Sequence, residues 1–557
     1  MLPTTTTPLI EELHREAAAI VSAKTVAPIT YTGYQAYLTT GDRRTFEDQY
    51  FQRRKQLVVL GLSQYLAPEE AKGTMLNEVL WAILNEYTWG LPAHMPVTGN
   101  TYGDGAPYWL DLFAAETGEA LAELKFLIGA QLPPELNHRI DVEIERRIFT
   151  PFAAHDWAWQ HKTNNWSAVI GGCIGITAIY QMSATSSRLQ AFRARLDTAL
   201  TTYLASFGDD GASEEGVSYW AYGFGYYLYY AELAARRLGD DHYLQLPKVR
   251  AIAAFPEAAQ LTAADNVPFS DYGRITLPTG LLNFCRQTFK VPTPPITTMN
   301  AVDFDHCYRF AQLYRDLLWA PATLDAPAPL PASDRYFQDV QWWLVRAPEH
   351  KLVFAAKGGR NDESHNHIDL GHIVFGTEQT LFLTDLGAGE YTRDYFDDDK
   401  RYAYFPPAAT AHDVPIINGQ TQQFGPYAAK AHPEPNGLTL TLTAAYPTVA
   451  GLGAYTRHLT LAKSARRFTC EDTFAFAHGE NTVVENLVTL IPPTLQGEKA
   501  LLEAAGERCV LSFPGASLHV TPQPYRDHDN HQRTAYRIQA EYTGATTLTI
   551  SVSGQLQ

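Results

Sequence analysis

The chain has 557 residues, of which 45% are hydrophobic and 18% are charged, and its formal net charge at pH 7 is −17. A chain of this length exceeds what one hydrophobic core accommodates, so we expect two or three domains. The acidic charge excludes a general nucleic-acid binder, which needs a basic footprint, and no apolar run is long enough to cross a membrane.

The cysteines and the N-terminal residues predict the compartment. Five cysteines are scattered along the chain without a Cys-x-x-Cys pair, which predicts neither a disulfide framework nor a zinc ribbon. Residues 1–8 lack the basic and apolar segments of a signal peptide. We therefore expect a cytoplasmic protein, and a secreted one if the sequence is a trimmed form.

Helical periodicity dominates residues 9 to about 318, as in Leu76, Val79, Leu80 and Ile83. The expected helices cover 9–23, 45–64, 68–88, 108–131, 165–183, 187–205, 216–238 and 303–318. Proline and glycine mark the joints between them. Many consecutive antiparallel helices without a strict sequence repeat predict a helical array or toroid over residues 1–320.

A Pro/Ala-rich stretch at 321–333 predicts a linker, after which the apolar period changes from 3.6 to 2. The expected strands cover 340–346, 352–356, 373–375, 381–384, 438–442, 458–461, 483–490, 509–513, 535–541 and 547–552. Short strands without intervening helices predict an antiparallel β-sandwich over residues 334–557.

Three histidines crowd into the start of the β region, between Ser364 and Phe375. If this segment is a strand, His365 and His367 point to the same face, because side chains alternate along a strand. Two such imidazoles can bind a metal, or one can bind metal while the other moves protons. Two solvated histidines are the alternative.

Two later residues complete a possible metal site. Asp385 ends an apolar segment, and His412 precedes another. Together with His367 they form a set of two histidines and one carboxylate, which suits Zn²⁺. We expect a structural zinc site and predict that His365 stays off the metal.

Two motifs in the helical region carry polar groups at helix starts. Asn164 and Asn165 open one helix, where one amide can act as the cap and the second remains unexplained. Tyr219 and Tyr222 lie three residues apart in an aromatic, glycine-rich helix and can face the same cleft. An aromatic core stripe is the alternative for the tyrosines.

In combination, these motifs resemble the heparinase II/III family of polysaccharide lyases. The resemblance covers nearly the whole chain and is carried by Asn164-Asn165-Trp166, Glu215-Gly216, Tyr219 to Gly223, Ser364 to His367 with Asp369, Asp385 with Gly387 and Tyr391, and His412-Asp413 before Asn418-Gly419. The chain departs from many relatives at Asp413, where they have Asn, and from some at Asn165, where they have His. The family implies an incomplete α/α toroid joined to a β-sandwich, β-elimination on uronic-acid glycans and, in several members, zinc.

The resemblance also implies roles. Asn164 and Asn165 are expected to neutralise the substrate carboxylate, and Tyr219 to act as base, acid or both, with Tyr222 as its substitute. His365 is expected to stabilise the tyrosinate or to act as base on the other face of the sugar. The expected substrate contacts are Trp89, His94, Trp220, Arg360, Tyr391 and Arg393.

Heparin or heparan fragments are the favoured substrates, with alginate and other uronate oligosaccharides as alternatives. A glycoside hydrolase would need two opposed carboxylates, for which Glu86, Asp111, Glu214 and Glu215 are the candidates. A noncatalytic glycan-binding protein would need the aromatic residues but no metal site. A cytoplasmic location predicts an exo-acting enzyme on imported oligosaccharides.

Overall fold

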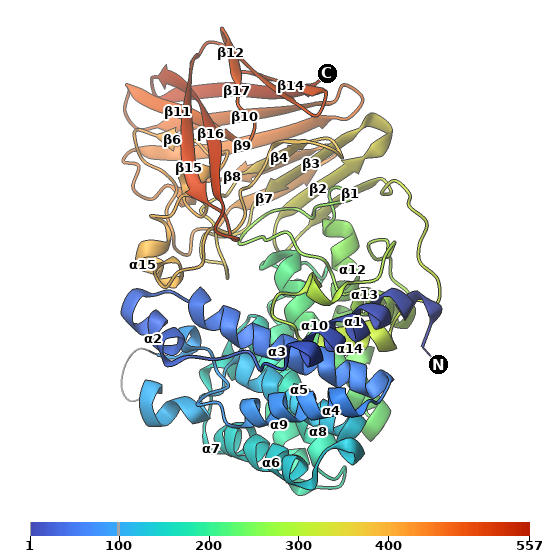
Figure 1. Cartoon of the computed structure of the whole chain (residues 1–557). Coiled ribbons are helices and arrows are strands. Elements are labelled where there is room, and N and C mark those ends of the chain that lie inside the picture. Colours follow the sequence, from blue (N-terminus) through green and yellow to red (C-terminus); the bar gives the residue numbers. More distant parts are fainter. Residues whose placement is uncertain (1, 97–100) are drawn as a thin grey trace. The chain divides into compact units, whose positions relative to one another are not determined.

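The structure is a computed structural model and describes residues 2–96 and 101–557. The chain forms two compact units (Figure 1). The helical unit comprises Met1–Phe207, Ser218–Ala254 and Ile275–Pro327, and the β unit comprises Gly208–Val217, Phe255–Arg274 and Ala328–Gln557.

Paired helices build the helical unit. The helices are α1 (Thr7–Ala23), α2 (Tyr31–Thr40), α3 (Arg44–Leu66), α4 (Glu70–Leu84), α5 (Leu112–Ile128), α6 (Pro134–Ile144), α7 (Thr150–Ala154), α8 (Asn165–Gln181), α9 (Ser187–Leu204), α10 (Gly216–Leu238), α11 (His242–Gln245), α12 (Pro247–Ala259), α13 (Thr279–Phe289) and α14 (Phe310–Leu318). Helix α3 packs against α4, α5 against α8, and α8 against α9. This arrangement is the predicted incomplete α/α toroid.

Helix α8 is buried along most of its length, and two of its glycines allow α10 to approach closely. A Cβ atom on Gly172 would lie 2.6 Å from the carbonyl oxygen of Tyr226, and one on Gly175 would lie 2.5 Å from the ring of Tyr230. Only glycine fits at such distances. The packing fixes α8, whose first turn carries the predicted asparagine pair.

The β unit contains three antiparallel sheets, with strand orders β1-β2-β3-β4-β5, β12-β13-β14-β17-β10-β9-β8-β7 and β15-β16-β11-β6. The strands are β1 (Ser333–Phe337), β2 (Trp342–Ala347), β3 (Leu352–Lys357), β4 (Ile373–Gly376), β5 (Leu381–Leu383), β6 (Ile416–Ile417), β7 (Lys430–Glu434), β8 (Gly437–Thr441), β9 (Leu452–Ala462), β10 (Arg467–Phe476), β11 (Asn481–Thr489), β12 (Thr494–Gln496), β13 (Lys499–Ala504), β14 (Glu507–Ser512), β15 (Ser517–Arg526), β16 (Gln532–Gly544) and β17 (Thr547–Leu556). In Figure 1, β15, β16 and β11 run across the direction of β9, β10 and β17.

One hydrophobic core joins the sheets into the predicted sandwich. Phe468 on β10 lies between two rings of the five-stranded sheet, with ring centroids 4.8 Å from Phe375 and 6.3 Å from Phe354. These side chains alternate inward along their strands, so each sheet presents an apolar face to the core.

Two segments from the first half of the sequence belong to the β unit, although the sequence predicts one boundary at residue 320. Phe269 packs on Trp342 at 5.2 Å between ring centroids, and Phe255 packs on Phe337 at 5.6 Å. The Gln338 backbone N–H donates to Asp210 Oδ2 over 2.7 Å. These two segments, one of which includes the end of α12, therefore pack against the strands of the β unit.

All five cysteines are free thiols and buried. Among the described residues, none of the helices combines the length and apolar character that crossing a membrane requires.

Candidate active site and metal centre

The three predicted metal ligands lie together in the β unit. His367 Nδ1 is 3.5 Å from Asp385 Oδ1, and His412 Nδ1 is 3.4 Å from Asp385 Oδ2. Asp385 follows β5 by two residues and His412 precedes β6, so strand ends position both side chains. Although burial disfavours its charge, His412 and His367 hold the pKa of Asp385 well below its ordinary value.

The donor atoms of this cluster fit a metal ion. Among the described residues, His367 Nδ1, Asp385 Oδ2 and both ring nitrogens of His412 are buried without a hydrogen-bond partner. Buried polar atoms are normally paired, so such a convergence of unpaired atoms calls for a missing group. Two imidazoles and a carboxylate are a common ligand set for a divalent metal. The residues form a cluster that could hold a metal ion.

Asp369 and His372 extend the cluster beyond the three predicted ligands. One oxygen of Asp369 lies within 4.8 Å of ligand atoms of the other three residues, and Asp369 Oδ2 accepts a 2.8 Å bond from buried Lys357. His372 Nδ1 accepts from the Asp413 backbone N–H over 3.0 Å, which leaves the ring proton on Nε2, 3.8 Å from Asp385 Oδ2. The Nε2–H group of His372 thus faces the Asp385 carboxylate from beyond hydrogen-bond distance.

Asp413 stands where many relatives of the resembling family have Asn. Its Oδ1 accepts a 2.6 Å bond from the Val488 backbone N–H. Burial raises the pKa of Asp413 well above its ordinary value.

Asp271 is a site residue that sequence reasoning missed. Its buried carboxylate accepts bonds from His365 Nδ1 at 2.9 Å, His367 Nε2 at 3.2 Å, the Tyr395 hydroxyl at 2.7 Å and Arg401 at 2.8 Å. Burial would raise the pKa of Asp271, but Arg401 and the two histidines hold it well below the ordinary value. The carboxylate is therefore ionised beside both histidines.

The histidine segment is a loop rather than the predicted strand. Regular strand structure begins only at Ile373, and His365 adopts a left-handed φ of 56°. This conformation breaks the alternation on which the shared face of His365 and His367 depends. Both rings still reach a common partner, because each turns to Asp271. His365 Nε2 lies 3.6 Å from Glu215 Oε1, which also accepts from Ser364.

The asparagine pair opens α8 as predicted. Asn164 is the N-cap, and its Oδ1 accepts from the Trp166 backbone N–H over 3.1 Å. Asn165 is the first residue of the helix and is only 2% exposed. The cap uses one carbonyl oxygen and leaves the amide NH₂ group of Asn164 outside that bond.

Of the two tyrosines of α10, Tyr222 has polar neighbours that the structure defines. Tyr219 and Tyr222 are both half-buried. The Tyr222 hydroxyl donates to Glu116, and the Arg309 guanidinium lies 4.1 Å from the centre of the Tyr222 ring. Burial and the Glu116 charge raise the pKa of Tyr222 well above its ordinary value. Tyr222 is thus engaged in an ionic network of the helical unit.

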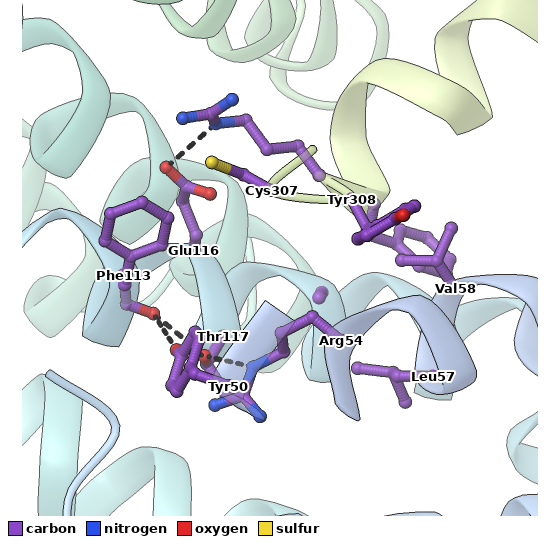
Figure 2. Close-up of a pocket in the computed structure, with 12 residues that line it drawn as sticks. Tyr50, Arg54, Leu57, Val58, Phe113, Glu116, Thr117, Cys307 and Tyr308 are labelled. Atoms are coloured by element: carbon purple, nitrogen blue, oxygen red, sulfur yellow. Dashed lines mark hydrogen bonds and ion pairs between the residues drawn. The ribbon is translucent and has the colours of Figure 1, made fainter. Parts of the chain in front are cut away.

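Glu116 and Arg309 also line a small cavity of about 20 Å³, room for roughly one water molecule (Figure 2). Figure 2 shows Glu116, Thr117 and Tyr50 on one side of this space and Cys307 and Tyr308 on another. Arg54 at the cavity wall binds Glu86 over 2.9 and 2.8 Å, so its charge is already compensated. A space of this size has room for one water molecule but not for a sugar ring.

Glu116→Gln is expected to change how stability depends on pH. Burial raises the pKa of Glu116 to about 7, against the opposing effects of Arg309 and Tyr222. A carboxyl with a raised folded-state pKa binds its proton more tightly in the native state, so it favours the fold below pH 4.5 and loses that contribution as the pH rises to 7. The loss is on the order of 3 kcal/mol.

Urea unfolding of both proteins between pH 4 and 8 measures this effect. As the pH rises from 4.5 to 7, the wild type should lose unfolding free energy relative to the variant. This change is expected whether the variant is more or less stable than the wild type at low pH. Parallel stability curves would show that Glu116 does not titrate in this range.

Two of the expected substrate contacts are buried inside the helical unit. Trp89 and Trp220 are 1% and 0% exposed, and their indole N–H groups donate to the carbonyl oxygens of Ile83 and Ile252. Neither ring can stack on a sugar, because each fills the helical core. His94 is half-buried, and its Nδ1 binds buried Asp111 over 2.8 Å, which makes it part of the local fold.

The other expected contacts lie on the β unit. Arg360 has an exposed side chain that pairs with Asp362 over 2.7 Å, and Arg393 is exposed. Tyr391 is half-buried, and its ring centroid lies 5.3 Å from that of Tyr395, the residue that donates to Asp271. These three residues stay predictions as substrate contacts.

No sequence profile of a known protein family matches the chain, and no curated protein matches its sequence. Solved structures do match over nearly the full length. Heparinase III superposes with a TM-score of 0.64 and 13% identity, covering 100% of this chain and 92% of that one. The chain has the heparinase III fold.

Further structures share the heparinase III fold with this chain. Heparan sulfate lyase HepC from Pedobacter heparinus matches with a TM-score of 0.61 and 14% identity over 97% of this chain and 83% of that one. A chondroitin AC lyase from Streptomyces coelicolor A3, in complex with chondroitin sulphate, matches with a TM-score of 0.56 and 10% identity over 99% and 80%. The predicted toroid followed by a β-sandwich is confirmed.

Proposed function

We propose that the protein is a lyase that cleaves uronic-acid-containing glycans by β-elimination. The observation that carries the proposal is the histidine pair held by Asp271 in the β unit of a heparinase III fold. One ring of the pair belongs to the metal-binding cluster and the other remains available for proton transfer. Solved structures with this fold include lyases of heparan sulfate and chondroitin.

The reaction removes the C5 proton of a uronate and expels the oxygen at C4. The C5–H electrons form the C4–C5 double bond while the C4–O bond breaks. A base takes the proton, and an acid gives a proton to the departing oxygen. The substrate carboxylate must be neutralised so that negative charge can spread into it, and Asn164 and Asn165 are the proposed donors. Each such donor is worth about 3 kcal/mol in a transition state.

Tyr219 is the proposed proton-transfer tyrosine. An ordinary tyrosine with a pKa near 10 is a poor base at neutral pH unless a cation stabilises its phenolate. His365 is the proposed partner, either as that cation or as a second base. Tyr222 serves less well, because its hydroxyl already donates to Glu116, which raises its pKa further.

The proposed metal is Zn²⁺, held by His367, Asp385 and His412. Bound there, it would supply a structural cross-link between the loops that carry these residues. His365 keeps its Nδ1 on Asp271 and stays outside this ligand set.

A glycoside hydrolase is the rival function. Two of its candidate carboxylates, Glu86 and Asp111, are buried, which argues against it. Glu86 is committed to Arg53 and Arg54, over 3.1 and 2.8 Å. Asp111 is 0% exposed and caps α5 by accepting from Ala114 over 2.8 Å. Glu86 and Asp111 are therefore not available as a pair of opposed, solvent-facing acids.

The proposed substrate is a short oligosaccharide of the heparin type, with alginate and other uronates as alternatives. We propose a cytoplasmic location, which would restrict the enzyme to imported di- to tetrasaccharides and favour exo action. The net charge of −17 supports short substrates, because long-range attraction for a polyanion would be weak.

A panel of uronic-acid polymers and oligosaccharides tests this proposal. We expect ultraviolet absorbance of an unsaturated uronate to appear with one glycan class, and faster with its oligosaccharides than with its polymer. Size-exclusion analysis of the polymer digest should show slow release of small products from otherwise intact chains. No absorbance with any glycan would defeat the lyase proposal, and a rapid early fall in chain length would defeat exo action.

A further inference from the structure

We propose that Asp271 is a positioning residue that fixes the ring proton of two histidines at once. Through one oxygen it orients His365, and through the other it orients the metal ligand His367. The role of His365 in turnover rests on the proposed function, whereas the state of each ring does not.

The geometry of the carboxylate determines which nitrogen of each ring carries the proton. An ionised carboxylate only accepts hydrogen bonds, so His365 Nδ1 and His367 Nε2 must both be protonated donors. His367 Nδ1, 3.5 Å from Asp385 Oδ1, is then the nitrogen that would offer its lone pair to a metal ion. The other nitrogen of His365, Nε2, lies 3.6 Å from Glu215 Oε1.

Two further donors keep Asp271 ionised and oriented. The Tyr395 hydroxyl and the Arg401 guanidinium both bind Oδ1, over 2.7 and 2.8 Å. Arg401 also donates to the Asn366 carbonyl oxygen over 3.1 and 3.0 Å, which ties the same cation to the peptide between the two histidines. Of these four partners among the described residues, three therefore meet Oδ1 and the fourth, His365, meets Oδ2.

The backbone is strained on both sides of this contact. Ser270, which is fully buried, has a φ of 63°, and His365 has a φ of 56°. Left-handed conformations are unfavourable for such residues and persist where the surroundings impose them. The Ala388 backbone N–H donates to the Tyr272 carbonyl oxygen over 2.9 Å and holds the Asp271 segment in the β unit. Strain in the backbone at both partners indicates that the surrounding structure imposes the contact between Asp271 and His365.

The unequal use of the two oxygens makes Asp271→Asn a selective test. Three donors meet Oδ1, so the carbonyl oxygen of the new amide should take that position and its NH₂ group should face His365. An NH₂ group cannot accept a bond from Nδ1–H, so His365 must move its proton to Nε2. His367 keeps its acceptor and its metal. In serine proteases, moving the ring proton of the catalytic histidine to the wrong nitrogen in the same way lowers turnover about 10⁴-fold.

The measurements are the ¹³Cδ2 chemical shifts of labelled histidine, which distinguish the two tautomers, together with metal content and turnover. His365→Gln assigns the resonance. We expect the His365 signal alone to change to the Nε2–H form, metal content to stay at the wild-type level, and turnover to fall at least 10³-fold. Tyr395→Phe, which removes a donor from the same carboxylate but neither histidine contact, should leave the tautomer unchanged.

An unchanged His365 tautomer in Asp271→Asn, or the same change in Tyr395→Phe, would overturn the inference. The histidine spectra of both variants are recorded without substrate. Absence of lyase activity in the wild type would therefore defeat the proposed function and leave the positioning role to be decided by the spectra alone. An inverted tautomer with wild-type turnover would show that His365 has no part in catalysis.

Discussion

Tyr219→Phe is expected to lower turnover by about 10³-fold while leaving the fold and substrate binding largely intact. Proton transfer by a positioned side chain contributes 10² to 10⁴ in rate, and the substitution removes only the hydroxyl that would perform it. The side chain is half-buried at the start of α10, so the ring can keep its packing. Steady-state kinetics should show a fall in kcat with little change in KM, and thermal unfolding should be unaltered.

Tyr222→Phe is the matched control, three residues further along the same helix. It removes the hydroxyl that donates to buried Glu116, so we expect it to lower stability by about 1–3 kcal/mol, the value of a hydrogen bond to a charged group. Turnover should stay within about tenfold of wild type. If instead Tyr222→Phe abolishes turnover and Tyr219→Phe does not, the roles of the two tyrosines are reversed.

The sequence predicts the long elements well because their patterns are local. Residues 216–238 were expected as a helix and form α10 with the same bounds. Helix α13 is not predicted from the sequence, because prolines lie on both sides of its 11 residues and mark the region as a joint. Strand β10 is not predicted either, although its burial alternates, because the buried Asp472 interrupts its apolar face.

The proposed metal ligands could be predicted from the sequence, because Asp385 follows an apolar strand and His412 precedes one within the same region. Asp271 was not, because it lies 94 residues before His365 in a short segment between helices and belongs to no motif. Only the fold brings that segment into the β unit. The sequence could not place Trp89 and Trp220 either. An indole ring can fill a hydrophobic core or stack on a sugar, and only the fold shows that these two rings are buried in a core.

Removing one metal ligand is expected to empty the cluster and destabilise the β unit. His412→Ala deletes a fully buried ring whose nitrogens have no other hydrogen-bond partner among the described residues. Wild-type protein should contain about one zinc ion per chain, and the variant less than about a tenth of that. A ligand present at a thousand times its Kd stabilises the native state by about 4 kcal/mol, so the thermal midpoint of the variant should fall clearly.

Two controls separate this cluster from other effects. His458→Ala removes a histidine of the same unit whose side chain is 39% exposed, and it should change neither metal content nor the midpoint. Cys307→Ser alters the other group of possible ligands, Asp305, His306 and Cys307, in the helical unit. Asp305 is already bound by Arg309 over 2.7 Å, so this group should hold no metal and the variant should keep its zinc. Zinc that survives in His412→Ala but disappears in Cys307→Ser would place the ion in the helical unit and refute the β-unit site.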